Sequence, residues 1–94
     1  MLSLSLEQKS VIRAVAASHG VERVRVFGSF ARGDAKASSD LDLLVKFPAV
    51  STLLAVIGFK QAVEEATGLA VDIVEEGTLS PSFSARVYAE AIPL

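Results

Sequence analysis

Three of the four aspartates in this sequence interrupt segments that otherwise have the pattern of buried strands. Asp40 and Asp42 alternate with apolar residues in DLDLLV (40–45), and Asp72 stands inside VDIV (71–74). Residues two apart in a strand point to the same side, so Asp40 and Asp42 should share one face while the apolar residues between and after them face a core. The pattern predicts negative charges gathered beside a hydrophobic interior.

The electrostatic repulsion within such a group of carboxylates needs compensation. Two ionised carboxylates within about 5 Å of each other repel by roughly 3 kcal/mol at an effective dielectric constant near 20. Either a shared proton or a cation between them relieves the repulsion. Three convergent carboxylates without a nearby histidine favour the cation, and an all-oxygen site suits Mg²⁺, which also takes phosphate oxygens as ligands. The alternative is that Asp40 caps the strand entrance and that Asp42 and Asp72 lie on a solvated edge.

A second group of residues could bind phosphate. Gly28-Ser29 ends a predicted strand and enters a helical turn. Glycine lets the backbone approach a ligand closely, N–H groups at a helix start favour anions, and the serine hydroxyl adds a donor. Arg32 could also reach a phosphate, with a solvated loop charge as the equal alternative. A phosphate chain held at this turn could bridge to a metal on Asp40 and Asp42.

Capping and periodicity predict the elements that position these residues. Ser5 followed by Gln8 has the spacing of a capping box, and Gly20 and Gly68 are helix-ending residues. The predicted order is a helix over about 6–18, a strand over 21–27, a helical turn over 30–32, a strand over 40–47, a helix from Ser51 or Thr52 after Pro48 to about Ala66, a strand over 69–75, and a helix after Ser80-Pro81 to about Ala91. This order predicts an α+β fold, with helices packed against a small sheet of about three to four strands.

Composition limits the possible functions. The 94 residues predict a single domain over 1–94, too small to enclose two substrates, so a partner would present one of them. Hydrophobic residues make up 51% and charged ones 21%, below the usual charged share of about 25%, which predicts an apolar surface that a partner covers. The net charge of −2 and the absence of a basic cluster argue against direct nucleic-acid binding.

The sequence also limits redox chemistry and location. It contains no cysteine and one histidine, which excludes disulfides and Cys/His zinc sites. MLSLSLEQKS lacks the features of a signal peptide, and no apolar stretch approaches the length of about 18 residues that a membrane span needs. These features predict a cytoplasmic protein without membrane contact.

The helix predicted from residue 52 has apolar residues on more than one side: Leu53, Leu54, Val56, Ile57 and Phe59. Packing in the core is the favoured interpretation. Contact with a partner or with a second copy of the chain is the alternative.

Together these residues resemble a known family. Gly28-Ser29, ten intervening residues and Asp40-x-Asp42 reproduce the GSx₁₀DxD signature of the polymerase-β-like nucleotidyltransferases. Residues 28–33 and 39–45 also match the G-S-x-A-R-G and S-D-x-D-L-x-V pattern of its minimal form, the MNT proteins. The VDIV segment resembles the strand of the family's third aspartate, and the end of the last helix, Ala89-Glu90-Ala91, is similar to the family's C-terminal helix. The resemblance covers the whole chain, with no departure at the catalytic positions.

The resemblance implies a mixed sheet and the metal-dependent transfer of a nucleoside monophosphate from ATP to a hydroxyl group. Asp40 and Asp42 would hold two Mg²⁺ ions. Asp72 would help to hold one of them and activate the acceptor oxygen. Gly28 and Ser29 would hold the triphosphate.

The resemblance also implies a partner. By this resemblance the chain would be an antitoxin that adds AMP to a tyrosine hydroxyl of a HEPN-type toxin. A homo-oligomer or a hetero-oligomer is expected. Two alternatives remain open at this stage. The chain could be a non-catalytic antitoxin that occludes its toxin, or a catalytic subunit that modifies a small-molecule hydroxyl.

Overall fold

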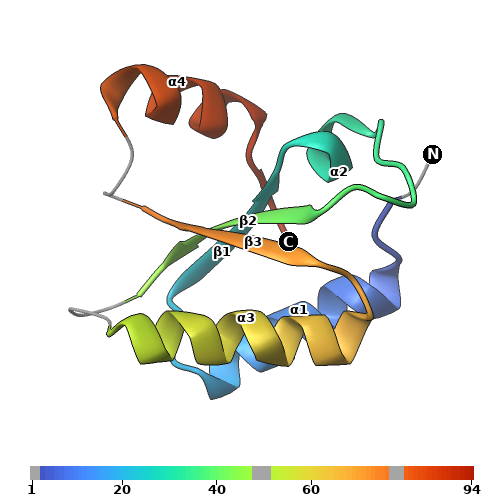
Figure 1. Ribbon diagram of the computed structural model, residues 1–94, viewed down its shortest axis with the longest axis vertical. Helices are drawn as coiled ribbons and strands as arrows, with labels where there is room; N and C mark the ends of the chain where they lie inside the picture. The colour runs from blue at the N-terminus through green and yellow to red at the C-terminus, as the bar shows by residue number, and fades with distance from the viewer. Residues whose placement is uncertain (1–2, 48–51, 77–79) are drawn as a thin grey trace.

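Helices and strands alternate around a mixed sheet in this computed structural model, which describes residues 3–47, 52–76 and 80–94 (Figure 1). The elements are α1 (Leu6–Ser18), β1 (Arg23–Phe27), α2 (Ser29–Arg32), β2 (Leu41–Lys46), α3 (Leu53–Thr67), β3 (Val71–Glu75), α4 (Pro81–Glu90) and β4 (Ile92–Pro93).

The sheet has the strand order β3-β2-β1-β4. β1 pairs antiparallel with both β2 and β4, whereas β2 and β3 are parallel. Parallel neighbours need a crossover connection, and α3 supplies it between β2 and β3. The predicted α+β class with a small mixed sheet is therefore confirmed.

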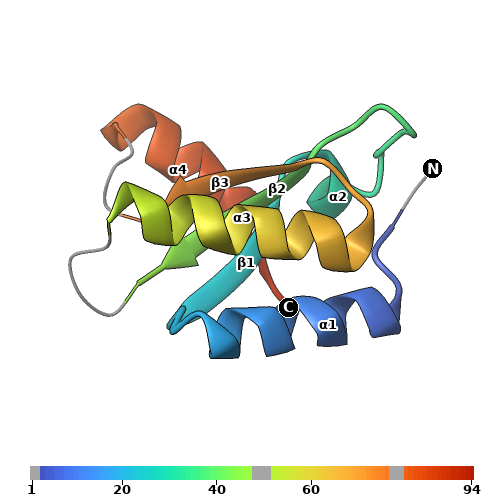
Figure 2. The same ribbon diagram turned by 60° about the horizontal axis from the view of Figure 1, so that its bottom comes forward.

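The two faces of the sheet are covered unequally. α1 and α3 lie side by side across one face, and α4 lies over part of the other (Figures 1 and 2). The larger core cluster sits under α1 and α3 and includes Ile12, Ala16, Leu41, Leu43, Val45, Phe59 and Val63. A smaller cluster on the opposite face joins Phe27, Leu44 and Val87. The alternation predicted for residues 41–45 is thus observed, and the less covered face is the one that carries Asp42.

Side-chain caps fix the helix starts. Ser5 and Gln8 form the predicted capping box: the N–H of Gln8 donates to Ser5 Oγ at 3.0 Å, and the N–H of Ser5 donates to Gln8 Oε1 at 2.9 Å. Thr52 caps α3 and Ser80 caps α4. The predicted alternative cap Ser51 and the break at Pro48 lie outside the described residues.

Four predicted boundaries need correction. β1 begins at Arg23 rather than residue 21, because the N–H of Val21 still donates to Ala16 at the end of α1. β2 begins at Leu41, whose N–H donates to Ala70 at 2.8 Å, so Asp40 precedes the strand. β3 likewise begins at residue 71 rather than 69. α4 ends at residue 90, because Ala91 is extended and leads into β4, which pattern analysis missed.

The apolar residues at the start of α3 do not all enter the core. Leu53 and Leu54 are 75% and 81% exposed, and Ile57 is 39% exposed, so the prediction of core packing is wrong for these three. It is right for Phe59, which is fully buried. Val56 is half-buried.

None of the helices in the described part of the chain has the length and hydropathy of a membrane span.

Candidate active site

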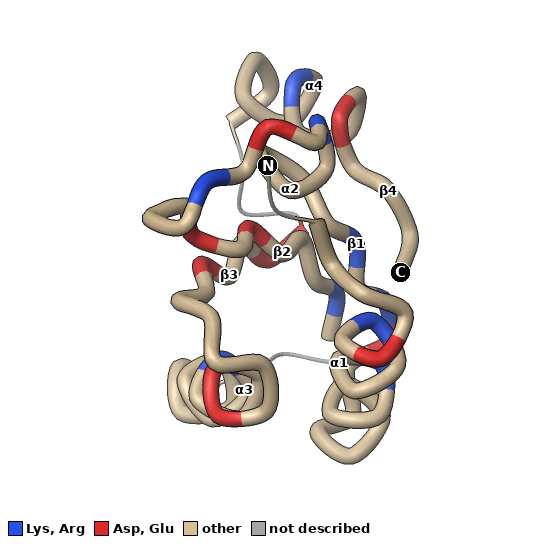
Figure 3. Tube along the Cα trace, turned by 90° about the vertical axis from the view of Figure 1, so that its right-hand side faces the viewer, with Lys and Arg blue, Asp and Glu red and all other residues tan. Residues whose placement is uncertain are grey.

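Asp42 and Asp72 lie on adjacent strands as direct partners in the parallel register of β2 and β3. Partners in a parallel pair point to the same face, with the strands about 4.8 Å apart. Figure 3 shows the acidic segments of the two strands side by side at one end of the sheet. The structure therefore brings together two of the three aspartates that the sequence singled out.

Asp42 is the aspartate whose environment is most perturbed. Burial raises the pKa of its carboxyl group, and the negative charges of Asp72 and then Asp40 raise that pKa further. The positive charge of Arg32 opposes the shift, and Glu90 adds to it. A half-buried carboxylate surrounded by acidic groups is the electrostatic setting in which a cation would be stabilised.

Gly28 lies directly against Asp42. Its backbone has φ 73° and ψ −150°, a region that only glycine adopts without strain. A Cβ atom at this position would contact the Asp42 carboxylate oxygen Oδ2 and stand 3.1 Å from Cγ. Glycine is therefore required here for both its backbone conformation and the space that Asp42 occupies.

Asp40 lies just outside the strand, with its side chain exposed. The preceding loop is held by a tight turn, in which the N–H of Lys36 donates to Ser39 Oγ at 2.8 Å and the N–H of Ser39 donates to the Lys36 carbonyl at 2.9 Å. Asp40 is near enough to Asp42 for its charge to raise the pKa of Asp42. It therefore belongs to the acidic group, although not by sharing a strand with Asp42 as predicted.

The remaining predicted residues lie on the turn after β1. Ser29 begins α2 and is half-buried, and Arg32 ends it. The Arg32 guanidinium donates from Nε to Asp34 Oδ2 at 3.3 Å and from Nη1 to Glu90 Oε1 at 3.1 Å. Glu90 is a site neighbour without an assigned role in the sequence analysis. Its only sequence signal was its place in the Ala89-Glu90-Ala91 segment, because an isolated glutamate at a helix end has no distinguishing pattern.

The fit of these residues to Mg²⁺ rests on their chemistry. Within residues 3–47, 52–76 and 80–94, no three Asp, Glu, His or Cys side chains are grouped closely enough to hold a metal ion. The donors themselves are suitable, because carboxylate oxygens are preferred Mg²⁺ ligands. Burial first, and then repulsion from Asp72 and Asp40, raises the pKa of Asp42, and a bound cation would offset that repulsion. The predicted magnesium site stays a prediction.

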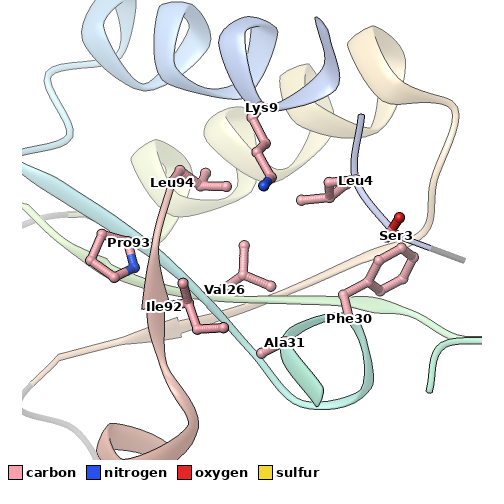
Figure 4. A pocket seen from close by; sticks show the side chains of 9 residues that line it. All are labelled: Ser3, Leu4, Lys9, Val26, Phe30, Ala31, Ile92, Pro93 and Leu94. Atoms are coloured by element: carbon pink, nitrogen blue, oxygen red, sulfur yellow. The ribbon is translucent and has the colours of Figure 1, made fainter. Parts of the chain in front are cut away.

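A small cavity of about 100 Å³ lies elsewhere, between α1, α2 and the C-terminal strand (Figure 4). Leu4, Val26, Phe30 and Leu94 give it apolar walls, and Lys9 points into it. None of the predicted site residues lines this cavity, so it is not the place where a triphosphate would meet the aspartates.

The raised pKa of Asp42 predicts a pH dependence of stability. Because the folded state holds this proton more tightly than the unfolded state, the stabilising contribution of Asp42 is fully present below its ordinary pKa of 3.8 and is lost as pH rises through the raised value. The melting temperature of the Asp42→Asn variant, relative to wild type without metal, should therefore increase between about pH 4 and pH 7. A difference that stays constant across this range would contradict the shift, and added Mg²⁺ should reduce the difference.

Comparison with known proteins places this chain in a family. Residues 9–94 match the nucleotidyltransferase domain family, and the chain therefore belongs to that family and is a nucleotidyltransferase. The chain is similar to a candidate protein adenylyltransferase, MJ0435, of Methanocaldococcus jannaschii, with 36% identity over 86 residues and 92% of each chain covered. It is also 34% identical over 100 residues to the protein adenylyltransferase MntA of Thermococcus cleftensis, with 98% of each chain covered.

Solved structures share the fold. A candidate minimal nucleotidyltransferase matches with a TM-score of 0.84 and 48% identity, covering 94% of this chain and 90% of that one. A chain of a toxin–antitoxin crystal structure with AMP-PNP matches with a TM-score of 0.80 and 20% identity, covering 90% and 70%. A third match comes from the tri-AMPylated HEPN toxin of Shewanella oneidensis in complex with its MNT antitoxin, with a TM-score of 0.73 and 17% identity, covering 93% and 68%. At these lower identities the last two show a common fold.

Proposed function

We propose that this nucleotidyltransferase transfers AMP from ATP to a tyrosine hydroxyl group of a partner HEPN toxin and acts as the antitoxin of the pair. The observation that carries the proposal is the pairing of Asp42 with Asp72 on the less covered face of the sheet, directly against Gly28. The relatives named protein adenylyltransferase support AMP as the transferred group. The structures of toxin–antitoxin complexes support a toxin as the acceptor.

Each group of residues at this site would have its own role in the reaction. Asp40 and Asp42 would hold two Mg²⁺ ions, and Asp72 would help to hold one of them. The metal would supply positive charge against the charge that develops on the phosphoryl oxygens. Gly28 and Ser29 would bind the triphosphate through the turn between β1 and α2, and Arg32 would add a positive charge. The acceptor oxygen would attack the α-phosphorus, its proton would pass to Asp72, and pyrophosphate would leave.

The position of Asp72 fits the role of proton acceptor. Its side chain is exposed, whereas Asp42 on the neighbouring strand is half-buried. An acceptor hydroxyl brought by a second protein can therefore reach Asp72 from solvent, at the edge strand of the sheet. In the proposed reaction, the partner toxin would present that hydroxyl.

The test compares catalysis with neutralisation. The wild type and the Asp40→Asn/Asp42→Asn double variant are each combined with the partner toxin, ATP and Mg²⁺. Intact-mass spectrometry then measures AMP addition, and a cleavage assay measures toxin activity. We expect the wild type to add AMP and silence the toxin, and the double variant to do neither. Full neutralisation by the double variant would instead support inhibition by occlusion, and the absence of AMP addition by the wild type would refute the proposed reaction.

A further inference from the structure

Glu90, the last residue of α4, reaches across to the turn that joins β1 to α2. Its Oε2 accepts the N–H of Gly28 at 3.2 Å, and its Oε1 accepts Nη1 of Arg32 at 3.1 Å. One carboxylate therefore joins both ends of the turn over residues 28–32. It also connects the C-terminal helix to a segment 62 residues earlier in the chain.

The contact with Gly28 satisfies a structural need. Gly28 is buried, and a buried backbone N–H requires an acceptor. Because the backbone of Gly28 departs from the β1 conformation at φ 73°, its N–H does not simply continue the strand, and Glu90 supplies the acceptor from another element. A charged acceptor makes this hydrogen bond stronger than one between neutral groups.

Glu90 binds donors that a triphosphate would also use. The packing and hydrogen bonds of the residues on both sides of Glu90 favour a fixed contact with the turn over a competitor that a triphosphate displaces. One turn earlier, Val87 is 2% exposed and packs with Phe27 and Leu44. Directly after Glu90, the N–H of Ala91 donates to Val87 at 2.9 Å, and Ile92 pairs with Val26 of β1. The backbone of Glu90 is thus held on both sides.

Glu90 occupies the Gly28 N–H, but other donors of the turn remain available to a phosphate. Arg32 has five guanidinium N–H groups, of which Glu90 and Asp34 use two. Its side chain is 49% exposed, so a phosphate can approach the others. Ser29, whose hydroxyl is the proposed phosphate donor, lies between the two groups that Glu90 holds.

We propose that Glu90 is a positioning residue that holds the Gly28–Ser29 turn and Arg32 in the conformation that binds the triphosphate. This inference rests on the proposed function of the turn. It extends the site to the junction of α4 and β4, and it implies that this C-terminal segment takes part in nucleotide binding without touching the nucleotide.

The test uses two variants of Glu90 and one control. Glu90→Ala removes both contacts, whereas Glu90→Gln keeps a carbonyl oxygen for Gly28 but loses the ionic pair with Arg32. Glu22→Gln removes the same charge from an exposed position at the far end of β1. Calorimetric titration with AMP-PNP and Mg²⁺ should show binding weaker by about tenfold for Ala and about threefold for Gln, with Glu22→Gln unchanged.

Two further measurements separate positioning from general destabilisation. In the AMP-transfer assay, KM for ATP should rise while kcat changes less than about twofold, because Asp40, Asp42 and Asp72 all stay in place and Glu90 is the smallest of the influences on the pKa of Asp42. Hydrogen exchange of the Gly28 amide, measured by NMR without nucleotide, should be fastest in Glu90→Ala, intermediate in Glu90→Gln and unchanged in Glu22→Gln. If Glu90→Ala does not fold, Glu90→Gln decides the result.

Unchanged nucleotide binding in the Glu90 variants would overturn the inference, and tighter binding would identify Glu90 as a competitor of the triphosphate. Failure of the wild type to bind AMP-PNP would instead count against the proposed function. Exchange of the Gly28 amide would then decide alone whether Glu90 holds the turn, and equal exchange in all variants would refute it.

Discussion

Replacing Asp42 with asparagine should lower the rate of AMP transfer by about three orders of magnitude. Asp42 is the aspartate whose side chain lies against Gly28, and the charges of both Asp72 and Asp40 raise its pKa further after burial. Asparagine keeps the size of the side chain but removes the charge that would bind Mg²⁺. The measurement is the initial rate of AMP transfer to the toxin at saturating ATP.

The same substitution should not lower the melting temperature at neutral pH. Burial and the charges of Asp72 and Asp40 raise the pKa of Asp42, so its ionised form is disfavoured in the folded state. Glu65→Gln is the matched control, because it removes a charge from an exposed position on α3, across the sheet from the site. A transfer rate within about tenfold of wild type for Asp42→Asn would contradict the assigned role.

Replacing Gly28 with alanine should destabilise the fold by about 3 kcal/mol and reduce AMP transfer by about a hundredfold. The backbone conformation at Gly28 is strained for any other residue, and the added Cβ would collide with the Asp42 carboxylate. Displacement of that carboxylate should disturb the metal and the triphosphate together. Denaturant unfolding and the transfer assay measure the two effects.

Gly33→Ala provides the control for backbone strain. Gly33 also has a positive φ, of 82°, but a Cβ there would meet nothing within 4 Å. The Gly33→Ala substitution should lower the free energy of unfolding by about 1 kcal/mol and leave the transfer rate within a few fold of wild type.

The double variant Gly28→Ala/Asp42→Ala tests the contact between the two positions. It should be less destabilised than the sum of the two single variants, because the smaller residue at position 42 removes the collision. Simple additivity would show that the two positions do not interact.

The parts of the fold that the sequence predicted well are those governed by local chemistry. Two helix boundaries were predicted correctly: the capping box of Ser5 and Gln8 marks the start of α1, and Gly68 marks the end of α3. Each signal lies within a few residues of the boundary that it sets. The alternation from Leu41 to Val45 gave the correct inward face of β2 for the same reason. The mixed character of the sheet came from the resemblance to the family.

The structural features that could not be predicted from the sequence depend on contacts between segments far apart in the chain. The sequence predicted that Asp42 and Asp72 converge, but not that they are direct partners in the parallel register of β2 and β3. β4 has two residues and includes Pro93, so it has no detectable strand pattern and is defined by its pairing with β1. The contact of Glu90 with Gly28 likewise exists only once α4 packs on the sheet.

The most direct test of the central claim is a crystal structure of the chain with AMP-PNP and Mn²⁺ in place of Mg²⁺, with the metal located by anomalous scattering. The account predicts a metal peak within coordination distance of Asp42 and Asp72, with the triphosphate against Gly28 and Ser29. A nucleotide bound elsewhere, or a metal that does not contact Asp42, would contradict it.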